Sequence, residues 1–332
     1  MQYYGIDIHK KYSTYTMVDE QGNIMNQGKI DNSIEAFKEV FREASGINTK
    51  AVIESTCNWY YIHDLLEGMV DEVVIAHPLR TKAIASAKVK TDKIDATTLA
   101  QLLRADLIPR AYIAPPVIRD LRELLRYRAS MVRIRTKVKN KIHAILIKNG
   151  INSPFSDLFG KRGREWLKTI EVRTVYLLAI NGYLQLIDFL DGQIKPVTRA
   201  IDLMAKDNPH AKLLETIPGI GHYSAMLILG EVGDFSRFPS AKHLVSYAGL
   251  NPSVHSSGGI TRYGRITKQG SSWLRWIMVE VASIASRHSP RLGRLHSRVA
   301  YKHGHNTANI AVAREILTIC YYLIRKGESY KE

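Results

Sequence analysis

The segment Tyr4-Gly5-Ile6-Asp7-Ile8-His9 opens the stretch of sequence that decides the fold. Apolar side chains alternate along it with small or polar ones, which is the period of a half-buried strand. Residues 12–18, Tyr-Ser-Thr-Tyr-Thr-Met-Val, are rich in β-forming side chains, and Gln21-Gly22-Asn23 is typical of a turn before a third run that ends at Ile30. These residues predict a three-stranded antiparallel meander.

Helical and strand-like segments alternate after the meander. The predicted order is a helix from Ser33, a buried strand over 51–54, a helix over 59–68, a strand over 72–76 and a helix through residues 92–103. A meander followed by α/β units indicates a mixed sheet flanked by helices, and this is the layout of the ribonuclease H fold. We therefore expect an α/β domain over residues 1–110.

The composition changes after Pro115-Pro116. Residues 111–150 contain ten Lys or Arg against two acidic residues, and their apolar residues keep helical spacing, which predicts a long amphipathic helix with a basic outer face. A second helical stretch over 173–206 suggests an antiparallel, coiled-coil-like pair within a region of residues 111–206. A solvated helix face is the alternative, but the imbalance favours nucleic-acid contact. The expected contacts are Arg122, Arg126, Arg133, Lys137 and Lys141.

The third region, residues 207–332, is predicted to be mainly α-helical. Ile217-Pro218-Gly219-Ile220-Gly221 lies between two apolar-periodic helices and resembles a helix-hairpin-helix. Gly219 and Gly221 permit a tight turn, and the N–H groups that open the next helix can hold a phosphate. A hairpin used only for packing fits equally well.

The whole chain is strongly basic, with 47 Lys and Arg against 31 Asp and Glu and a net charge of +16, while 45% of its residues are hydrophobic. It is therefore a folded protein that needs an acidic partner, and nucleic acid is the first candidate. A membrane is disfavoured because no apolar run approaches ~18 residues. Cys57 and Cys320 form no disulfide framework, and Met1 to Lys10 show no export signal, so a cytoplasmic location is expected.

Four carboxylates are candidates for chemistry: Asp7, Glu54, Asp92 and Asp95. Asp7 lies on the polar face of the first strand, Glu54 ends a buried strand, and the other two share one side of a helix. Acids at strand ends are costly to bury unless a hard cation compensates their charge, and Mg²⁺ is the natural occupant. Surface and helix-start acids are the alternative for each residue alone.

Three N-terminal blocks resemble the DEDD transposases of the IS110 family of bacterial insertion sequences. They are Gly5-Ile6-Asp7-Ile8-His9-Lys10, Ile53-Glu54-Ser55-Thr56 and Lys90-Thr91-Asp92-Lys93-Ile94-Asp95-Ala96. The C-terminal half carries further similar blocks: residues 217–221, Tyr247-Ala248-Gly249-Leu250-Asn251-Pro252, His255-Ser256-Ser257-Gly258-Gly259 and Arg265-Ile266-Thr267-Lys268-Gln269-Gly270. The resemblance implies a RuvC-like first domain and a C-terminal transposase domain. Cys57 stands where family members often carry Gly.

The resemblance also implies a mechanism. Family members use a noncoding bridge RNA to pair with donor and target DNA, and the protein cuts and exchanges strands. By this resemblance Asp7, Glu54, Asp92 and Asp95 are the metal-binding tetrad and Ser257 is the nucleophile, with Ser256 as the runner-up. The basic segment after the serine block predicts further nucleic-acid contacts at Arg262, Arg265 and Lys268.

Assembly in trans, and hence a homo-oligomer such as a dimer or tetramer, is expected from two distant catalytic parts on one chain. Two other functions stay open on the residues alone. A RuvC-like nuclease would hydrolyse branched DNA with the four carboxylates and water, and a non-catalytic scaffold would only bind nucleic acid. All three functions require salt-sensitive binding, so binding does not separate them.

Overall fold

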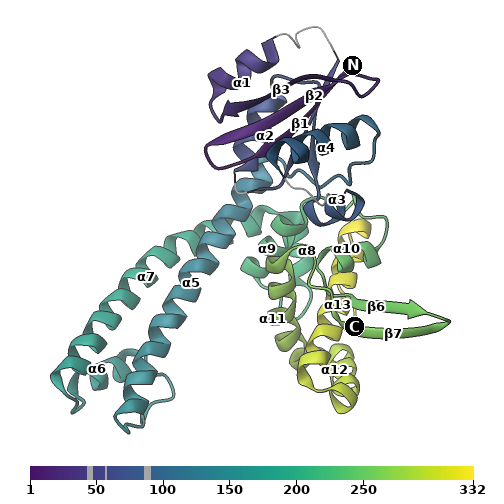
Figure 1. Ribbon diagram of the computed structural model, residues 1–332. Helices are drawn as coiled ribbons and strands as arrows, with labels where there is room; N and C mark the ends of the chain where they lie inside the picture. The colour runs from purple at the N-terminus through teal and green to yellow at the C-terminus, as the bar shows by residue number, and fades with distance from the viewer. Residues whose placement is uncertain (43–47, 57, 86–90) are drawn as a thin grey trace. The chain divides into compact units, whose positions relative to one another are not determined.

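The computed structural model describes residues 1–42, 48–56, 58–85 and 91–332. Cys57 and Lys90, which belong to the motifs above, lie outside these ranges. The chain divides into two compact units, Met1–Ile113 and Ala114–Glu332. Figure 1 labels most of the helices and strands of each unit.

The first unit is built on a five-stranded sheet of order β3-β2-β1-β4-β5. The strands are β1 (Gln2–Ile8), β2 (Tyr12–Val18), β3 (Ile24–Asp31), β4 (Thr49–Glu54) and β5 (Glu72–Ala76). Strands β1, β2 and β3 pair antiparallel, whereas β4 runs parallel to β1 and β5 runs parallel to β4. The predicted meander and the mixed α/β architecture are therefore confirmed.

Helices α1 (Ile34–Phe41) and α2 (Trp59–Glu67) pack on one face of this sheet, and α4 (Asp92–Arg104) packs on the other. The unit also contains α3 (Pro78–Ile84). Apolar residues of β1 pack with Phe37 of α1 and Ile62 of α2 in one core cluster, while Val52 of β4 packs with Leu99 of α4 in another. The short helix α3 was not predicted, although Pro78 at its first turn is a helix-start signal.

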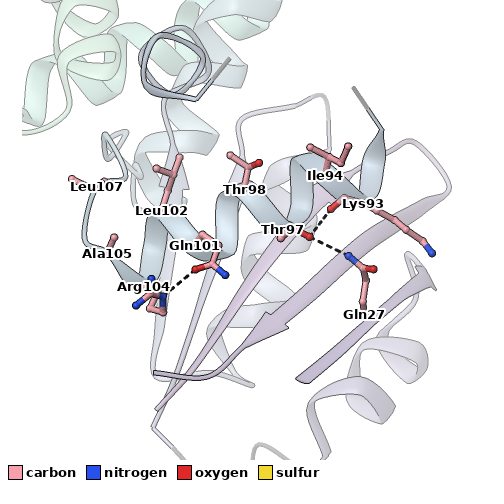
Figure 2. A pocket seen from close by; sticks show the side chains of 10 residues that line it. All are labelled: Gln27, Lys93, Ile94, Thr97, Thr98, Gln101, Leu102, Arg104, Ala105 and Leu107. Atoms are coloured by element: carbon pink, nitrogen blue, oxygen red, sulfur yellow. Dashed lines mark hydrogen bonds between the residues drawn. The ribbon is translucent and has the colours of Figure 1, made fainter. Parts of the chain in front are cut away.

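Polar side chains fix α4 across the meander. The Thr97 hydroxyl donates to the Lys93 carbonyl oxygen at 2.8 Å and accepts from the Gln27 amide of β3 at 3.1 Å, as Figure 2 shows. The hydroxyls of Thr97 and Thr16, the latter on β2, are also 3.1 Å apart. These bonds set the position of α4 along the sheet, and its first turn carries two of the predicted acids.

The second unit begins with two long helices, α5 (Pro116–Lys148) and α7 (Thr174–Asp207), with the short α6 (Lys161–Thr169) between them. Arg128 bonds Thr198, and Arg135 pairs with Asp191, so the two helices run antiparallel as predicted. Whether their packing is that of a coiled coil stays a prediction. Helix α5 contributes Leu125 to one core and Val138 to another. The boundary between a region ending at residue 206 and a domain starting at 207 stays a prediction as well.

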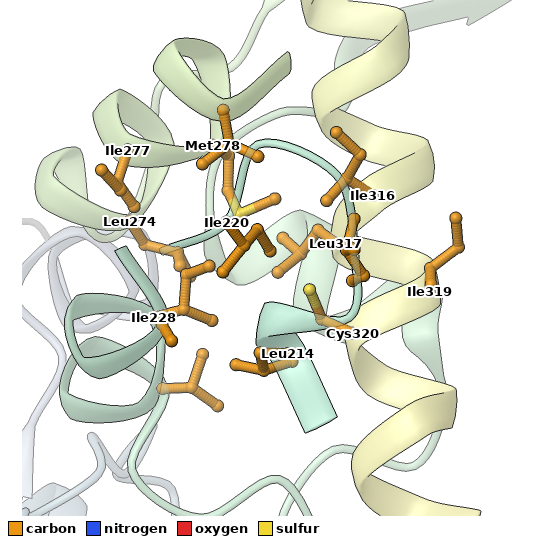
Figure 3. Packing of buried hydrophobic residues seen from close by; sticks show 14 of the residues in the cluster. Leu214, Ile220, Ile228, Leu274, Ile277, Met278, Ile316, Leu317, Ile319 and Cys320 are labelled. Atoms are coloured by element: carbon orange, nitrogen blue, oxygen red, sulfur yellow. The ribbon is translucent and has the colours of Figure 1, made fainter. Parts of the chain in front are cut away.

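The C-terminal part of the second unit packs helices around one apolar core, shown in Figure 3. Its elements are α8 (Pro209–Glu215), α9 (His222–Val232), α10 (Ala241–Tyr247), β6 (Pro252–Ser257), β7 (Ile260–Ile266), α11 (Ser272–His288), α12 (Pro290–His303) and α13 (His305–Lys326). Cys320 lies within this core, and burial raises the pKa of its thiol to about 12. The thiol therefore stays protonated and unreactive at neutral pH.

Helix α13 is long and apolar enough to cross a membrane by length and composition. Half of that apolar stretch is buried inside the protein, where Val312, Ile316 and Leu317 contribute to the core. Packing in the core accounts for its apolar side chains. Arg314 and Glu315 interrupt the apolar residues of α13, so the helix contains no uninterrupted apolar run of that length.

Candidate active site

The sheet brings Asp7 and Glu54 to the same edge. Strands β1 and β4 run parallel with Ile6 opposite Ile53, and the next residue on each strand is one of the two acids. Because side chains alternate between faces along a strand, residues at equivalent positions on neighbouring strands share a face. Both acids are partly buried. The predicted placement of two carboxylates at the ends of adjacent strands follows from this register.

Gly5 brings α4 against β1 and thereby places Asp92. A Cβ atom at Gly5 would lie 2.1 Å from the carbonyl oxygen of Ala96, so only glycine permits this approach of helix and strand. Asp7 follows Gly5 by two residues, about 6.6 Å along the strand, and Asp92 precedes Ala96 by four residues, about 6 Å along the helix. Helix α4 runs antiparallel to β1. The displacement from Gly5 to Asp7 along β1 and the displacement from Ala96 to Asp92 along α4 therefore point the same way and are nearly equal, which brings the two acids together.

Asp7, Asp92 and His9 form a compact group in which one ligating atom of each lies within 4.8 Å of the others. His9 Nε2 is 3.0 Å from Asp92 Oδ2 and 3.3 Å from Asp7 Oδ2. Glu54 and Asp95 are not members of this three-residue group, although β4 and the first turn of α4 place them at the same edge. The structure thus brings two of the four predicted acids together, with His9 between them.

Sequence reasoning missed His9. It follows the end of β1 and stands two residues after Asp7, the spacing that puts side chains on one side of an extended chain. That spacing was the available signal. Tyr12 completes the surroundings, because its hydroxyl donates to Asp92 Oδ2 at 3.4 Å and its ring lies 4.7 Å from the His9 ring. Desolvation and then the Asp92 charge raise the pKa of Tyr12, so its hydroxyl remains a donor at neutral pH.

The donors in this group fit a hard divalent cation. Adjacent ligands in an octahedral site with bonds of about 2.1 Å lie about 3.0 Å apart, close to the separations measured between His9 and the two carboxylates. A second group of possible ligands, His63, Asp64 and Glu67, lies along α2, where His63 Nδ1 and Asp64 Oδ1 are 3.0 Å apart.

The serine block forms an ordered hairpin rather than a flexible loop. Strands β6 and β7 are joined by Gly258 and Gly259, whose φ angles of 55° and 78° are those of a type I′ turn, which only glycine and a few polar residues adopt readily. Ser257 is the last residue of β6 and pairs with Ile260. Residues 254–265 are all exposed. The hairpin therefore presents both of its faces to solvent.

The two adjacent serines lie on opposite faces of this hairpin. Ser256 pairs with Thr261, and their hydroxyl oxygens are 3.2 Å apart. His255 pairs with Arg262. Since directly paired residues share a face and successive residues alternate, Ser257 lies on the face of His255 and Arg262. A shallow hollow is lined by both serines, His255 and Arg262.

Two of the predicted nucleic-acid contacts on α5 are engaged inside the protein. Arg122 is buried and donates to the carbonyl oxygens of Gly230 and Glu231, at 2.7 and 2.9 Å, at the end of α9. Arg126 donates to both carboxylate oxygens of Glu231. The expected basic outer face is therefore wrong for Arg122, and also for Arg119, which is buried. The hydrogen bonds of Arg122 and Arg126 hold α5 to the end of α9.

Arg133, Lys137 and Lys141 are exposed on α5. The Arg133 guanidinium lies over the rings of Trp273 and Trp276 of α11, at 4.3 and 4.9 Å from their centroids. Stacking of this kind orients an arginine while leaving its donors available. These three residues remain predicted contacts for nucleic acid.

The glycine turn between α8 and α9 is partly covered by another helix. Gly219 has a φ of 89°, and a Cβ there would lie 3.0 Å from the backbone nitrogen of Ala285 in α11. Gly221 has open space around it and precedes α9. Close packing thus accounts for Gly219, and phosphate binding at Gly221 stays a prediction.

The three basic residues predicted to contact nucleic acid after the serine block are exposed on β7 and just after it: Arg262, Arg265 and Lys268.

Comparisons with known proteins match both parts of the chain. Residues 4–148 match the family model of the IS110-type DEDD transposases, described as a transposase, and residues 211–297 match a model described as the transposase IS116/IS110/IS902 family. A pilin gene-inverting protein of Moraxella bovis is 29% identical over 341 residues, which cover 99% of this chain and 97% of that protein. The transposase for insertion sequence element IS1111A of Coxiella burnetii is 23% identical, with 98% of this chain and 90% of that protein covered.

Proposed function

The chain belongs to the IS110 family of DEDD transposases and is a DNA transposase, and from this premise we propose that it exchanges DNA strands through a covalent serine–DNA intermediate under the direction of a bridge RNA. The grouping of Asp7, His9 and Asp92, with ligating atoms within 4.8 Å of one another, is the observation that carries the proposal, because these residues could hold a cation in the α/β unit. We assign residues 1–110 of that unit as the RuvC-like domain.

The proposed reaction conserves a phosphodiester bond. The Ser257 oxygen attacks a DNA phosphorus, a serine–phosphate ester forms, and the bond to one DNA oxygen breaks to leave a hydroxyl end. Attack by a hydroxyl of the exchanged strand then reforms a DNA phosphodiester and returns the serine. Because each step replaces one phosphate ester with another, the exchange requires no nucleotide cofactor.

Asp7, Glu54, Asp92 and Asp95 are proposed to hold Mg²⁺. A bound divalent cation would polarise a scissile phosphate and stabilise charge on the oxygens around it. The chain's own contribution is to fix the acids: the parallel register of β1 and β4 sets two of them, and the approach of α4 over Gly5 sets Asp92. Glu54 and Asp95 complete the tetrad by the match of their motifs to the family.

The hairpin supports Ser257 rather than Ser256 as the nucleophile. Arg262 lies on the Ser257 face, where its guanidinium can hold a DNA phosphate beside the hydroxyl. Ser256 faces Thr261 instead. A two-stranded ribbon also fits into the major groove of DNA, and the exposed β6–β7 ribbon has the glycine tip and basic side chains that this approach requires.

The proposed partners are donor DNA, target DNA and a noncoding bridge RNA, bound by a dimer or tetramer at the bacterial nucleoid in the cytoplasm. The net charge of +16 supports binding to several phosphate backbones. We also propose that residues 111–206 act as a basic helical region and residues 207–332 as the transposase domain with a helix-hairpin-helix. No membrane partner is proposed.

Two measurements test this function. The first is to purify the protein from its host and sequence the RNA that copurifies; a discrete RNA encoded beside the gene supports bridge-RNA guidance, and only bulk cellular RNA contradicts it. The second is to react the protein with labelled DNA and denature it. A label retained on the protein supports the serine intermediate, whereas efficient cleavage without retained label favours a RuvC-like nuclease that uses water. Absence of any cleavage with its guide and both DNAs present favours a binding scaffold.

A further inference from the structure

His9 stands among the proposed metal ligands, yet none of the family motifs assigns it a role. We propose that His9 is a third ligand of the divalent cation, beside Asp7 and Asp92, and that its nitrogen makes the site bind Mn²⁺ more tightly than Mg²⁺. The proposal rests on the proposed metal-dependent function and goes beyond it, because a site of carboxylates alone would show a smaller preference for Mn²⁺.

The position of the His9 ring nitrogen is the first observation. Nε2 is buried and lies 3.0 Å from Asp92 Oδ2 and 3.3 Å from Asp7 Oδ2. Neither contact has the geometry of a hydrogen bond, and Nε2 has no hydrogen-bond partner in the described part of the chain. A buried polar atom in a folded protein normally has a partner. A cation between this nitrogen and the two oxygens would supply one.

A simple ion pair explains the arrangement less well. A protonated imidazole would point its Nε2 proton along one line in the ring plane, toward an acceptor. Neither carboxylate oxygen lies where it would accept that proton, although both are near. Three possible ligand atoms that lie close together, with no hydrogen bond from the imidazole nitrogen to either carboxylate, are typical of a metal site.

The surroundings of His9 hold it in place. Its carbonyl oxygen accepts from the amide groups of Asn32, at 2.7 Å, and Asn58, at 3.1 Å, and its N–H donates to the Tyr12 carbonyl oxygen at 2.9 Å. The Tyr12 ring packs on the imidazole. Fixed ligands of this kind lose little freedom when a cation binds. The turn between β1 and β2 is therefore built around the position of His9.

The donor set predicts which cation binds better. Mg²⁺ prefers oxygen ligands and retains its waters, whereas Mn²⁺ accepts an imidazole nitrogen more readily, and affinity for mixed nitrogen and oxygen sites rises along the transition-metal series. Two carboxylates and one imidazole thus favour Mn²⁺. Which metal occupies the site in cells depends on metal availability as well as on affinity, so the prediction concerns affinity alone.

The test measures metal binding by the full-length protein rather than its activity. Free Mn²⁺ is followed by electron paramagnetic resonance during titration, and Mg²⁺ affinity is obtained by competition. His9→Ala should weaken Mn²⁺ binding at least ~10-fold and change Mg²⁺ binding by less than ~3-fold, so the ratio of Mn²⁺ to Mg²⁺ affinity should fall at least ~3-fold. His9→Gln, which keeps a polar side chain, should give the same result if the alanine variant folds poorly. His143→Ala, which removes an exposed imidazole from α5, is the matched control and should keep the preference.

Pulsed resonance of bound Mn²⁺ gives a direct readout. The wild type should show coupling to a nitrogen nucleus, and both His9 variants should lose it. If His9→Ala and His9→Gln keep the wild-type ratio of Mn²⁺ to Mg²⁺ affinity, or if the wild type shows no nitrogen coupling, His9 is not a ligand. Asp92→Asn should abolish binding of both metals. If Asp92→Asn binds both metals as the wild type does, the proposed metal site itself is wrong. This outcome differs from the one that excludes only His9 as a ligand.

Discussion

The Arg126 guanidinium forms two hydrogen bonds with the Glu231 carboxylate, from Nε to Oε1 at 2.8 Å and from Nη2 to Oε2 at 3.1 Å. Glu231 is 1% exposed, and its Oε2 also accepts from the Ser271 hydroxyl at 2.8 Å. Ser271 caps α11 by accepting from the Leu274 N–H. One buried carboxylate thus links the long helix α5 to the start of α11, close in sequence to the serine hairpin.

Arg126→Ala is expected to destabilise the protein by about 3–5 kcal/mol, because it leaves the buried Glu231 charge without its cationic partner. Urea unfolding followed by circular dichroism measures the loss. Lys137→Ala removes an exposed charge from the same helix and should change the free energy of unfolding by less than about 0.5 kcal/mol. If Arg126→Ala has wild-type stability but binds DNA more weakly, Arg126 contacts nucleic acid as the sequence predicted.

Gly5→Ala should displace α4 and uncouple Asp92 from Asp7. The added methyl group would meet backbone atoms of Ala96 and Ala100 at 2.1 and 2.4 Å, and backbone cannot move aside as a flexible side chain can. We expect loss of metal binding and of DNA cleavage, measured by Mn²⁺ titration and by gel assay. Gly68→Ala is the control, since no atom lies within 4 Å of a Cβ built there. Unchanged metal affinity in Gly5→Ala would show that this helix contact does not position the acids.

Local patterns predicted the α/β unit well because each strand carries its own signal. The alternation over residues 4–8 and the apolar run before Glu54 specify strands whatever the rest of the chain does. Partners contributed by distant elements were beyond this reasoning. Arg122 and Arg126 read as surface charges on α5, and only tertiary packing places the end of α9 beneath them. His9 stands two residues after Asp7, but its closeness to Asp92, 83 positions further along the chain, appears only in the tertiary structure.

The exposed lysines of α5 should contribute to a salt-sensitive affinity. If 6–10 phosphates are neutralised, affinity for DNA should fall on the order of 10³-fold or more between 50 and 200 mM salt. Replacing Lys137 and Lys141 together by Ala should reduce the slope of log affinity against log salt by about 2. Lys331→Ala, an exposed charge near the C-terminus, should leave the slope unchanged. A flat salt response of the wild type would contradict the electrostatic interpretation of the +16 charge.

Asp7, Glu54, Asp92 and Asp95 should each be required for cleavage in Mg²⁺. Changing any one to Ala removes an anionic ligand but little packing, so the variants should remain folded while strand cleavage is abolished. Asp7→Ala and Asp92→Ala should also lose metal binding most, because only these two acids belong to the compact group with His9. Asp64→Ala, in the separate group on α2, serves as the control. Cleavage at the wild-type rate by Asp92→Ala and Asp95→Ala would disprove the tetrad.

Ser257 and Ser256 provide the sharpest contrast, because adjacent residues of one strand face opposite sides of the hairpin. Ser257→Ala should eliminate cleavage and the covalent protein–DNA adduct while DNA binding survives, since a methyl group supplies no nucleophile and the basic surface is unchanged. Ser256→Ala loses only the contact with Thr261 and should retain both activities. Labelled DNA trapped on the denatured protein, followed by mapping of the modified peptide, measures the outcome.

Arg262→Ala extends the same experiment to the Ser257 face. If this guanidinium holds the phosphate that the serine attacks, its loss should slow adduct formation by about 10- to 100-fold, because removing a charged hydrogen bond to phosphate costs roughly 1.5–3 kcal/mol. Thr261→Ala, its neighbour on the opposite face, should form the adduct at nearly the wild-type rate. Equal effects of the two changes would mean that the hairpin acts as a whole and not through one face. Efficient cleavage without any adduct after both serines are replaced would instead require water as the nucleophile.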